Sequence, residues 1–470
     1  MKNGHPVQTV AASLKIACVS SAGARAAPAD RGTAVRLSAT AAAMMAAVLV
    51  TAAGSCQAVD VRLWHAMSGP AGEKLNELVT RFNSEQHDVH VIPEYKGSYS
   101  ETLESALAAA RGGKGPDLVQ GYDVATAALL ADSRDFRPLH QVLSETGVQL
   151  DSHAFFPNIA TYYSDRPGKL AALPLNTSTA VLLYNKDAFQ RAGLDPEVPP
   201  RTWRDIQTMT LAIQSHQATP CGYTTDWQSW IHLENLAAWH NEAFATKANG
   251  LDGADARLNF NSVFMLRHIS LLSAWSRSGL FTYAGRENKG ESKFADGECA
   301  ILTTSSASLG PVLEHAKFNV GVAPLPYYDE YAGAPYASML GGAALWVMQG
   351  KKPPEYKGAA RFLAFLSRPA VQAEWHQATG YLPESKAAYD LTREQGFYKK
   401  MPGYEVAIRE MTGKAAGINA RGVRLADFAK IRDIIDEELE QVWAQRKAPK
   451  DALDAAVARG NQVLQAFKAK

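Results

Sequence analysis

The sequence predicts an α/β protein of two lobes, each built on a mostly parallel sheet flanked by helices. Its 470 residues are more than one ordinary core holds, which indicates two lobes. Hydrophobic residues make up 46% and charged residues 20%, the balance of a soluble globular protein. After residue 58, strand and helix patterns alternate without a Gly/Ser linker or an internal repeat. Directly packed lobes of this class are expected to hold a ligand in the cleft between them.

The amino-terminal region has the pattern of a secretory signal. Residues 37–54 are uncharged, follow an arginine and end in small residues, which predicts cleavage after Ala58. The apolar centre, residues 41–50, is about half the ~20 residues that a spanning helix needs. Residues 1–34 put a long polar stretch ahead of this signal, so we expect the true start at position 35. A lipidated Cys56 is the alternative, although "AGSC" lacks the leucine or valine that usually stands three places earlier.

The remaining chain is close to neutral and keeps two cysteines. Removing residues 1–58 leaves 43 basic and 46 acidic residues, a formal charge of −3. No polybasic tail or acidic run occurs, which argues against nucleic acid or an anionic membrane as a partner. Cys221 and Cys299 can bridge in an oxidising compartment, and closing this 78-residue loop would contribute about 4 kcal/mol in the chain-entropy model. Two small buried hydrophobic side chains are the alternative.

The first elements alternate strand and helix. They are expected at residues 59–67, 73–86, 89–97, 99–113 and 116–123. The glycine-rich stretch "GKGPDLVQGYD" follows a helix and precedes a strand, whereas phosphate loops run from strand to glycines to helix. These glycines are therefore expected to cap the helix, and Asp123 is expected to emerge at the cleft where the strand ends.

The alternation continues through the rest of the chain. Strands are expected at 171–185, 221–225, 297–306 and 344–350, and helices at 187–194, 202–216, 359–379, 431–445 and 452–470. With crossings near Pro174, Pro324 and Leu382, we expect an N-terminal lobe of residues 59–174 plus 325–380. The C-terminal lobe is expected to hold residues 175–324 plus 381–470.

The motifs of common enzymes and metal sites are absent from the sequence. It has no G-x-x-x-x-G-K-[ST], H-E-x-x-H, EF-hand loop or G-x-S-x-G turn, so we expect no cofactor, no metal and no enzymatic activity. His65, near the end of the first strand, could touch a ligand, but a lone histidine there is more often a hydrogen-bonded structural residue.

Several stretches carry a resemblance to a known family. They include "FNSEQHDVHVIPEYKGSY", "LLYNKDAFQRAGLDPEVPPRTW", "WQSWIHLEN", "LGGAALWVMQGK", "EWHQATGYLPESKAAYDL" and "IRDIIDEELEQVW". From about Trp64 to the carboxyl terminus, the chain resembles the periplasmic sn-glycerol-3-phosphate-binding proteins of bacterial ABC importers, within the larger group with the maltose-binding-protein fold. The resemblance implies a monomeric periplasmic protein. It would bind glycerol 3-phosphate or a glycerophosphodiester and deliver it to inner-membrane permease subunits that work with a cytoplasmic ATPase.

The resemblance also implies a ligand site. The matching positions are Tyr99, Asp123, Ser178, Ser305, Gly342, Tyr381 and Arg432, with Trp230 as a secondary candidate beside His65. Arg432 suits a phosphate because a guanidinium can bond two of its oxygens, although pairing with Asp433 or Asp436 on the surface is the alternative. Ser305 could meet the same anion with its hydroxyl, together with free N–H groups of the following helix.

The remaining positions suit the glycerol part of such a ligand. Tyr99 and Tyr381 can donate hydroxyl hydrogens and cover carbons, and Gly342 lets a backbone N–H approach closely. Asp123 would accept from glycerol hydroxyls, where the family pattern has a glutamate. A binding protein for another small sugar or an oligosaccharide is the first alternative, and a secreted phosphodiester hydrolase is the second.

Overall fold

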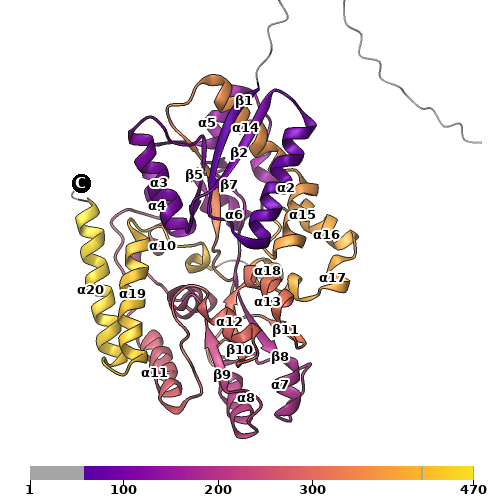
Figure 1. The fold of residues 1–470 in the computed structure, drawn as a ribbon. Coiled ribbons are helices and arrows are strands. Elements are labelled where there is room, and N and C mark those ends of the chain that lie inside the picture. Colours follow the sequence, from indigo (N-terminus) through magenta and orange to yellow (C-terminus); the bar gives the residue numbers. More distant parts are fainter. Residues whose placement is uncertain (1–57, 414–416, 469–470) are drawn as a thin grey trace, which may run out of the picture. The chain divides into compact units, whose positions relative to one another are not determined.

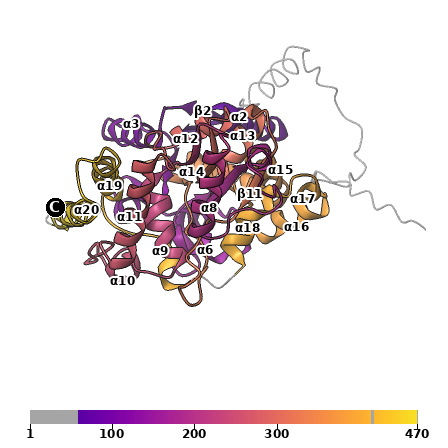
Figure 2. The ribbon, with the colours of Figure 1, turned by 90° about the horizontal axis from the view of Figure 1, so that it is seen from below.

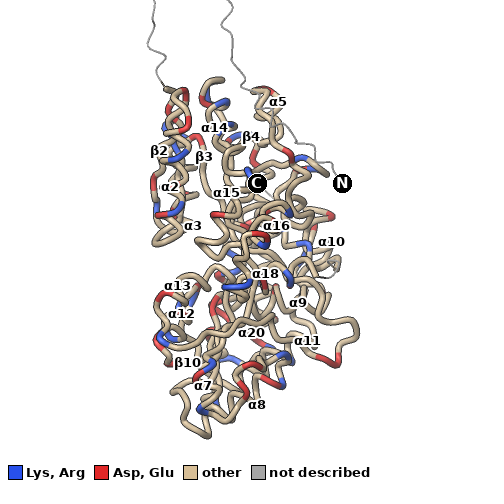
Figure 3. Tube along the Cα trace, turned by 90° about the vertical axis from the view of Figure 1, so that its right-hand side faces the viewer, with Lys and Arg blue, Asp and Glu red and all other residues tan. Residues whose placement is uncertain are grey.

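A computed structural model describes residues 58–413 and 417–468, which all belong to one compact unit, Gln57–Lys470 (Figure 1). The predicted signal region and the start at position 35 lie outside the described residues, apart from Ala58. No helix in the described ranges is long and apolar enough to cross a membrane. Acidic and basic residues are interspersed along the described chain (Figure 3).

The first sheet occupies the upper half of Figure 1 and has six strands in the order β2-β1-β3-β12-β4, with β7 paired to β12. Strands β1 and β2 and strands β1 and β3 pair in parallel, whereas β12 runs antiparallel to its three neighbours. Its strands are β1 (Val59–His65), β2 (Val89–Tyr95), β3 (Leu118–Tyr122), β4 (Phe136–Arg137), β7 (Leu173–Pro174) and β12 (Ala343–Met348).

Helices connect and cover the first sheet. They are α2 (Gly69–Glu85), α3 (Tyr99–Arg111), α4 (Thr126–Ala131), α5 (Leu139–Thr146), α6 (Pro157–Tyr162), α14 (Pro353–Leu366) and α15 (Pro369–Thr379), with short 3-10 turns η1 (Asp123–Ala125) and η2 (Ser152–Ala154) and a small ribbon of β5 (Ser164–Arg166) and β6 (Lys169–Leu170). Helix α3 begins in a capping box of Ser98 and Glu101 and ends at Gly112, followed by Gly113 at φ +68°. The predicted glycine cap is confirmed.

The second sheet lies in the lower half of Figure 1, with strand order β11-β8-β10-β9. Strand β10 is parallel to β9 and antiparallel to β8, and β11 is antiparallel to β8. The strands are β8 (Ala180–Asn185), β9 (Cys221–Thr225), β10 (Cys299–Ser305) and β11 (Val320–Ala323). The α/β class is confirmed, but both sheets hold more antiparallel pairs than expected, because β8 and β12 enter directly from the other sheet rather than through a helix.

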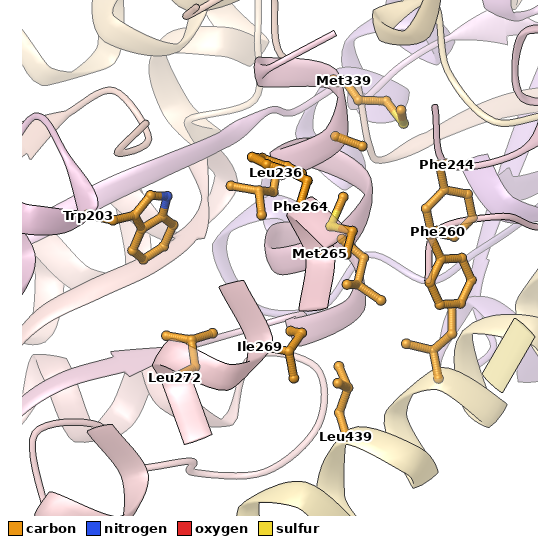
Figure 4. Packing of buried hydrophobic residues seen from close by; sticks show 14 of the residues in the cluster. Trp203, Leu236, Phe244, Phe260, Phe264, Met265, Ile269, Leu272, Met339 and Leu439 are labelled. Carbon is orange, nitrogen blue, oxygen red and sulfur yellow. The ribbon is translucent and has the colours of Figure 1, made fainter. Parts of the chain in front are cut away.

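The remaining helices surround the second sheet or follow it. They are α7 (Lys186–Arg191), α8 (Trp203–Ser215), the π-helix η3 (Trp230–Asn235), α9 (Leu236–Trp239), α10 (Thr246–Asn249), α11 (Val263–Ser278), α12 (Lys289–Ala295), η4 (Ser306–Ser308), α13 (Leu309–His315), α16 (Lys386–Glu394), α17 (Phe397–Lys400), α18 (Gly403–Thr412), η5 (Ile418–Ala420), α19 (Phe428–Trp443) and α20 (Pro449–Lys468). Helices α19 and α20 lie side by side (Figures 1 and 2). Figure 4 shows Trp203, Phe244 and Phe260 among the large apolar side chains of this core.

One helix differs from the expected boundaries. The sequence predicts one long helix at residues 359–379, but the structure has α14 ending at Leu366 and α15 beginning at Pro369. Pro369 lacks the N–H that would continue the helical ladder, and its ring clashes with a carbonyl in the preceding turn. It instead occupies the first turn of α15, where no N–H is needed.

The structure joins Cys221 and Cys299 by a disulfide. The two residues stand opposite each other on the parallel neighbours β9 and β10. Of the two alternatives left by the sequence, the bridged one is present.

The chain passes between the two sheets where β7 leads to β8 and where β11 leads to β12. The backbones of Ser178 and Gly341 pair with each other at these crossings, with N···O distances of 3.1 and 2.9 Å. A third segment joins them, since the Leu382 N–H donates to the Thr177 carbonyl at 2.8 Å and the Glu384 carboxylate accepts from the Thr177 N–H and hydroxyl. The exact lobe boundaries stay a prediction.

Candidate functional site

A cavity of about 880 Å³ lies between elements of the two sheets. Its lining includes all seven residues of the expected ligand site together with Trp230: Tyr99, Asp123, Ser178, Ser305, Gly342, Tyr381 and Arg432. They are brought together from segments spread over more than 300 residues, because strand ends and crossings meet at this place.

Apart from Arg432, which lies inside α19, these residues stand at an end of a regular element or close to a crossing. Tyr99 begins α3, and Asp123 directly follows β3. Ser305 ends β10, and Gly342 directly precedes β12. The remaining members are Ser178 in the first crossing, Tyr381 just after α15 and Arg432 in α19. The cavity is therefore lined by backbone whose direction changes, where N–H groups and side chains are free to face a ligand.

Arg432 is held by two carboxylates. Its Nε and Nη2 donate to the two carboxylate oxygens of Glu234, each at 2.7 Å, and Nη2 also donates to Asp123 Oδ2 at 3.0 Å. The side chains of Glu234, Asp123 and Arg432 are 1%, 10% and 15% exposed. Glu234 comes from the π-helix η3, which is buried along its whole length. Asp123 directly follows β3 of the first sheet, whereas Glu234 and Arg432 lie in helices grouped with the second sheet. This ion pair therefore links the two sides of the cavity.

Burial and charge oppose each other in this cluster. Burial raises the pKa of Asp123 and that of Glu234, and the charge of Arg432 only partly offsets it. Burial alone would lower the pKa of Arg432, but the charges of Glu234 and Asp123 raise it overall. Arg432 therefore stays protonated. Its Nη1 group has no hydrogen-bond partner among the described residues.

This pairing bears on the phosphate-binding role that the resemblance implies for Arg432, which stays a prediction. With both carboxylates ionised, the three side chains carry a net charge of −1, which disfavours an added phosphate dianion beside them. Asp433 and Asp436, the partners in the alternative surface pairing, line the cavity but form no ion pair with Arg432. Glu234 was missed by the sequence analysis because 198 residues separate it from Arg432 and no periodic pattern marks it.

Two tyrosines form a wall of the cavity. Tyr99 stacks on Tyr122 with ring centroids 5.6 Å apart and an interplanar angle of 4°. Tyr381 stacks on Trp375 at 5.9 Å and 3°. Burial raises the pKa of both Tyr99 and Tyr381, so both hydroxyls keep their hydrogens at neutral pH. The stacking fixes each ring, and the hydroxyl groups can serve as fixed hydrogen-bonding partners.

Small residues supply the rest of the polar lining. The Ser305 hydroxyl accepts from the Ala307 N–H at 3.2 Å, which leaves its own hydrogen to donate. Gly342 has φ +102°, and a Cβ there would lie 2.0 Å from the Asn176 carbonyl oxygen. The Gly342 N–H has no hydrogen-bond partner in the described part of the chain. Only glycine fits this position, which lines the cavity together with Ser178.

The two secondary candidates lie in different places. Trp230 lines the cavity and packs its indole against Gly341, where a Cβ would come within 2.7 Å of the ring. His65 lies outside this cavity, in the wall of a smaller hollow beside Tyr95. Its Nδ1 accepts from the Met67 N–H at 3.3 Å, and burial lowers its pKa to about 4.

A further part of the cavity is acidic. It is lined by Glu287, Asp433 and Asp436 together with Trp227, and by Arg286, whose charge is paired with Glu440. Burial raises the pKa of Asp436 to about 7, and its Oδ1 has no hydrogen-bond partner among the described residues. Within the same ranges, no group of three or more His, Cys, Asp or Glu side chains is arranged to hold a metal ion.

The sequence matches the model of one protein family and is similar to proteins with assigned names. Residues 77–405 match the bacterial extracellular solute-binding proteins. The sn-glycerol-3-phosphate-binding periplasmic protein UgpB of Escherichia coli is 47% identical over 417 residues, covering 88% of this chain and 95% of that protein. The protein of the same name from Pectobacterium atrosepticum is 46% identical over 430 residues, covering 91% and 96%.

Solved structures share the fold at lower identity. UgpB from Mycobacterium tuberculosis, solved in complex with glycerophosphocholine, is 23% identical with a TM-score of 0.72, covering 87% of this chain and 99% of that one. The cyclic alpha-maltosyl-1,6-maltose binding protein from Arthrobacter globiformis is 24% identical with a TM-score of 0.70 and the same coverage. These likenesses concern the fold alone. By its family match and its identity to relatives over nearly their full length, the chain belongs to the bacterial extracellular solute-binding proteins.

Proposed function

We propose that this chain is the periplasmic component of an ABC importer that captures sn-glycerol 3-phosphate and delivers it to a membrane permease. The observation that carries the proposal is the convergence of seven expected ligand residues in one cavity of a chain that is 47% identical to proteins named for this ligand. The family consists of binding proteins, so the proposal includes no catalytic step.

The charges in the cavity favour one orientation of the ligand. The phosphate avoids the carboxylates around Arg432 and lies instead against the Ser178 and Ser305 hydroxyls and the free Gly342 N–H. Donors of this kind suit phosphate oxygens. The glycerol hydroxyls then reach Asp123 as acceptor and the Nη1 group of Arg432 as donor, because a neutral hydroxyl can both donate and accept. This orientation keeps Asp123 in the role expected from the sequence and moves Arg432 from the phosphate to the glycerol.

The range of ligands extends to glycerophosphodiesters. The cavity of about 880 Å³ leaves room beyond a glycerol phosphate group. In its acidic part, Glu287, Asp433 and Asp436 outnumber the cation Arg286, which is paired with Glu440, and together with the Trp227 ring they have the chemistry that stabilises a cationic head group. A diester that carries such a group would place its phosphate against the same serines.

The transport cycle follows from contacts on both sides of the cavity. We propose that the lobes open at the three crossings, admit the ligand and close on it, since Asp123 and Arg432 lie on opposite sides. The closed protein, a monomer, then docks on permease subunits that work with a cytoplasmic ATPase. Export by the signal at residues 1–58, with cleavage after Ala58, brings it to the periplasm.

Calorimetric titration of the purified protein from Val59 onward tests this function. Glycerol 3-phosphate and glycerophosphocholine are expected to bind, and maltose is not. Binding of maltose without glycerol 3-phosphate would favour the sugar-binding alternative. Incubation with glycerophosphocholine separates the hydrolase alternative, because release of free choline would contradict a purely binding role.

A further inference from the structure

A chain of buried amide side chains leads from the backbone to the tyrosines of the cavity. The Ala66 N–H donates to Gln120 Oε1 at 2.8 Å. Gln120 Nε2 donates to Asn176 Oδ1 at 2.9 Å, and Asn176 Nδ2 donates to the Tyr99 hydroxyl oxygen at 2.8 Å. Gln120 and Asn176 are fully buried and do not line the cavity. They reach a ligand only through the tyrosines.

The direction of every bond in this chain is set by its first member. A backbone N–H can only donate, so Gln120 must turn its oxygen toward Ala66 and its NH2 group toward Asn176. Asn176 must then turn its oxygen toward Gln120 and its NH2 group toward Tyr99. The Tyr99 oxygen therefore accepts from Asn176, and its own hydrogen must point elsewhere.

The Tyr381 hydroxyl lies near Tyr99 and Asn176, and burial raises its pKa. The two tyrosine hydroxyls carry two hydrogens, and a bond between them would use only one. Apart from the two tyrosines themselves, no acceptor among the described residues takes either hydrogen. At least one tyrosine hydrogen is thus left to point into the cavity.

We propose that Gln120 and Asn176 are positioning residues that hold the Tyr99 hydroxyl oxygen as an acceptor and so leave a tyrosine hydrogen to donate to the ligand. This inference rests on the proposed function, because it concerns how the same cavity selects its ligand. A group that brings only acceptors, such as a phosphate oxygen, is bonded at this wall. A group that brings only donors, such as an ammonium, would leave the hydroxyl hydrogens unpaired and is rejected.

The variant Gln120→Glu tests the direction of these hydrogen bonds, and the changed side chain lies outside the cavity. An ionised carboxylate accepts at both ends, so Asn176 must turn over and offer its oxygen to Tyr99, which then donates to Asn176 instead of the ligand. A protonated carboxyl can still donate to Asn176 and mimics glutamine. Burial raises the pKa of such a carboxyl. We therefore expect a penalty in affinity that appears as pH rises.

The experiment measures the Kd of glycerol 3-phosphate for wild type and variant at pH 5.5 and pH 8.5 by calorimetry. Because the ligand phosphate itself titrates, the ratio of variant to wild-type Kd is compared at each pH. The expected ratio is about ten or more at pH 8.5, as for loss of one hydrogen bond to a charged oxygen, and about one to three at pH 5.5. In a Tyr99→Phe background the pH 8.5 ratio is expected to shrink at least about three-fold, because the penalty acts through that hydroxyl.

Gln372→Glu is the matched control, because Gln372 is also buried, in α15 beside the first sheet, and its side-chain oxygen accepts from the Ser385 hydroxyl rather than from a residue of this chain of amides. It is expected to show no pH-dependent ratio. If Gln120→Glu does not fold, Asn176→Asp carries the same expectation. A ratio that stays the same at both pH values, or is unchanged by Tyr99→Phe, overturns the inference. A wild-type protein that does not bind glycerol 3-phosphate at all overturns the proposed function instead.

Discussion

Replacing Glu234 by glutamine tests how far the buried ion pair supports both fold and site. The change keeps the size of the side chain but removes its charge and one of its two acceptor oxygens. The amide nitrogen would face the guanidinium of Arg432, whose donors now lie 2.7 Å from each carboxylate oxygen. The side chain of Glu234 is 1% exposed, so water cannot replace the lost acceptor.

The magnitude follows from these contacts. A hydrogen bond to a charged group contributes about 1.5–3 kcal/mol, and removing one partner of a buried ion pair costs about 3–5 kcal/mol. Because Asp123 remains as a second partner of Arg432, we expect the free energy of unfolding to fall by about 2–4 kcal/mol. The guanidinium also loses its fixed orientation, so we expect glycerol 3-phosphate to bind about ten-fold more weakly, or about 1.4 kcal/mol.

Urea unfolding followed by tryptophan fluorescence measures the first effect, and calorimetric titration measures the second. Glu437→Gln is the matched control, because Glu437 pairs with Arg459 on the surface and its side chain is 49% exposed. Such a pair contributes less than about 1 kcal/mol. If Glu234→Gln costs no more stability than Glu437→Gln and binds normally, the assignment of Glu234 as the support of Arg432 is refuted.

Three other changes have defined outcomes. Gly342→Ala would place a Cβ 2.0 Å from the Asn176 carbonyl oxygen at φ +102°, so we expect a loss of at least about 2 kcal/mol in stability and loss of binding; a normal melting curve would contradict this. Burial lowers the pKa of His376 to about 4. The neutral imidazole therefore makes its full contribution to the free energy of unfolding above the ordinary pKa near 6.5, and this contribution is lost as pH falls toward 4. The stability of wild type relative to His376→Gln should therefore drop by about 2 kcal/mol between pH 7 and pH 4.5 in urea titrations, and a pH-independent difference would count against a buried neutral imidazole. The double change Cys221→Ala with Cys299→Ala should lower stability by about 4 kcal/mol, and thiol titration of the unfolded wild-type protein from Val59 onward should find free thiols only after reduction.

The two-lobed α/β class was predictable because it depends on local patterns. Apolar residues repeat with helical spacing in α2, and the glycines after α3 occur where a helix must end. The break between α14 and α15 also has a local signal, Pro369. The apolar pattern continues on both sides of it, so the sequence was interpreted as one helix. The disulfide was not decidable, since the spacing of two cysteines does not reveal whether their strands are neighbours.

The sequence by itself determined the fold class, and through its resemblance to a family it indicated the residues that line the cavity. Only the tertiary structure decided how these residues share their charges and hydrogen bonds. Glu234 meets Arg432 across 198 residues, and Asn176 meets Tyr99 across 77. Periodicity and capping extend over a few turns of one element, whereas an ion pair or a hydrogen-bond chain depends on which elements pack together. The partners of a buried charge are therefore visible only when the chain is folded.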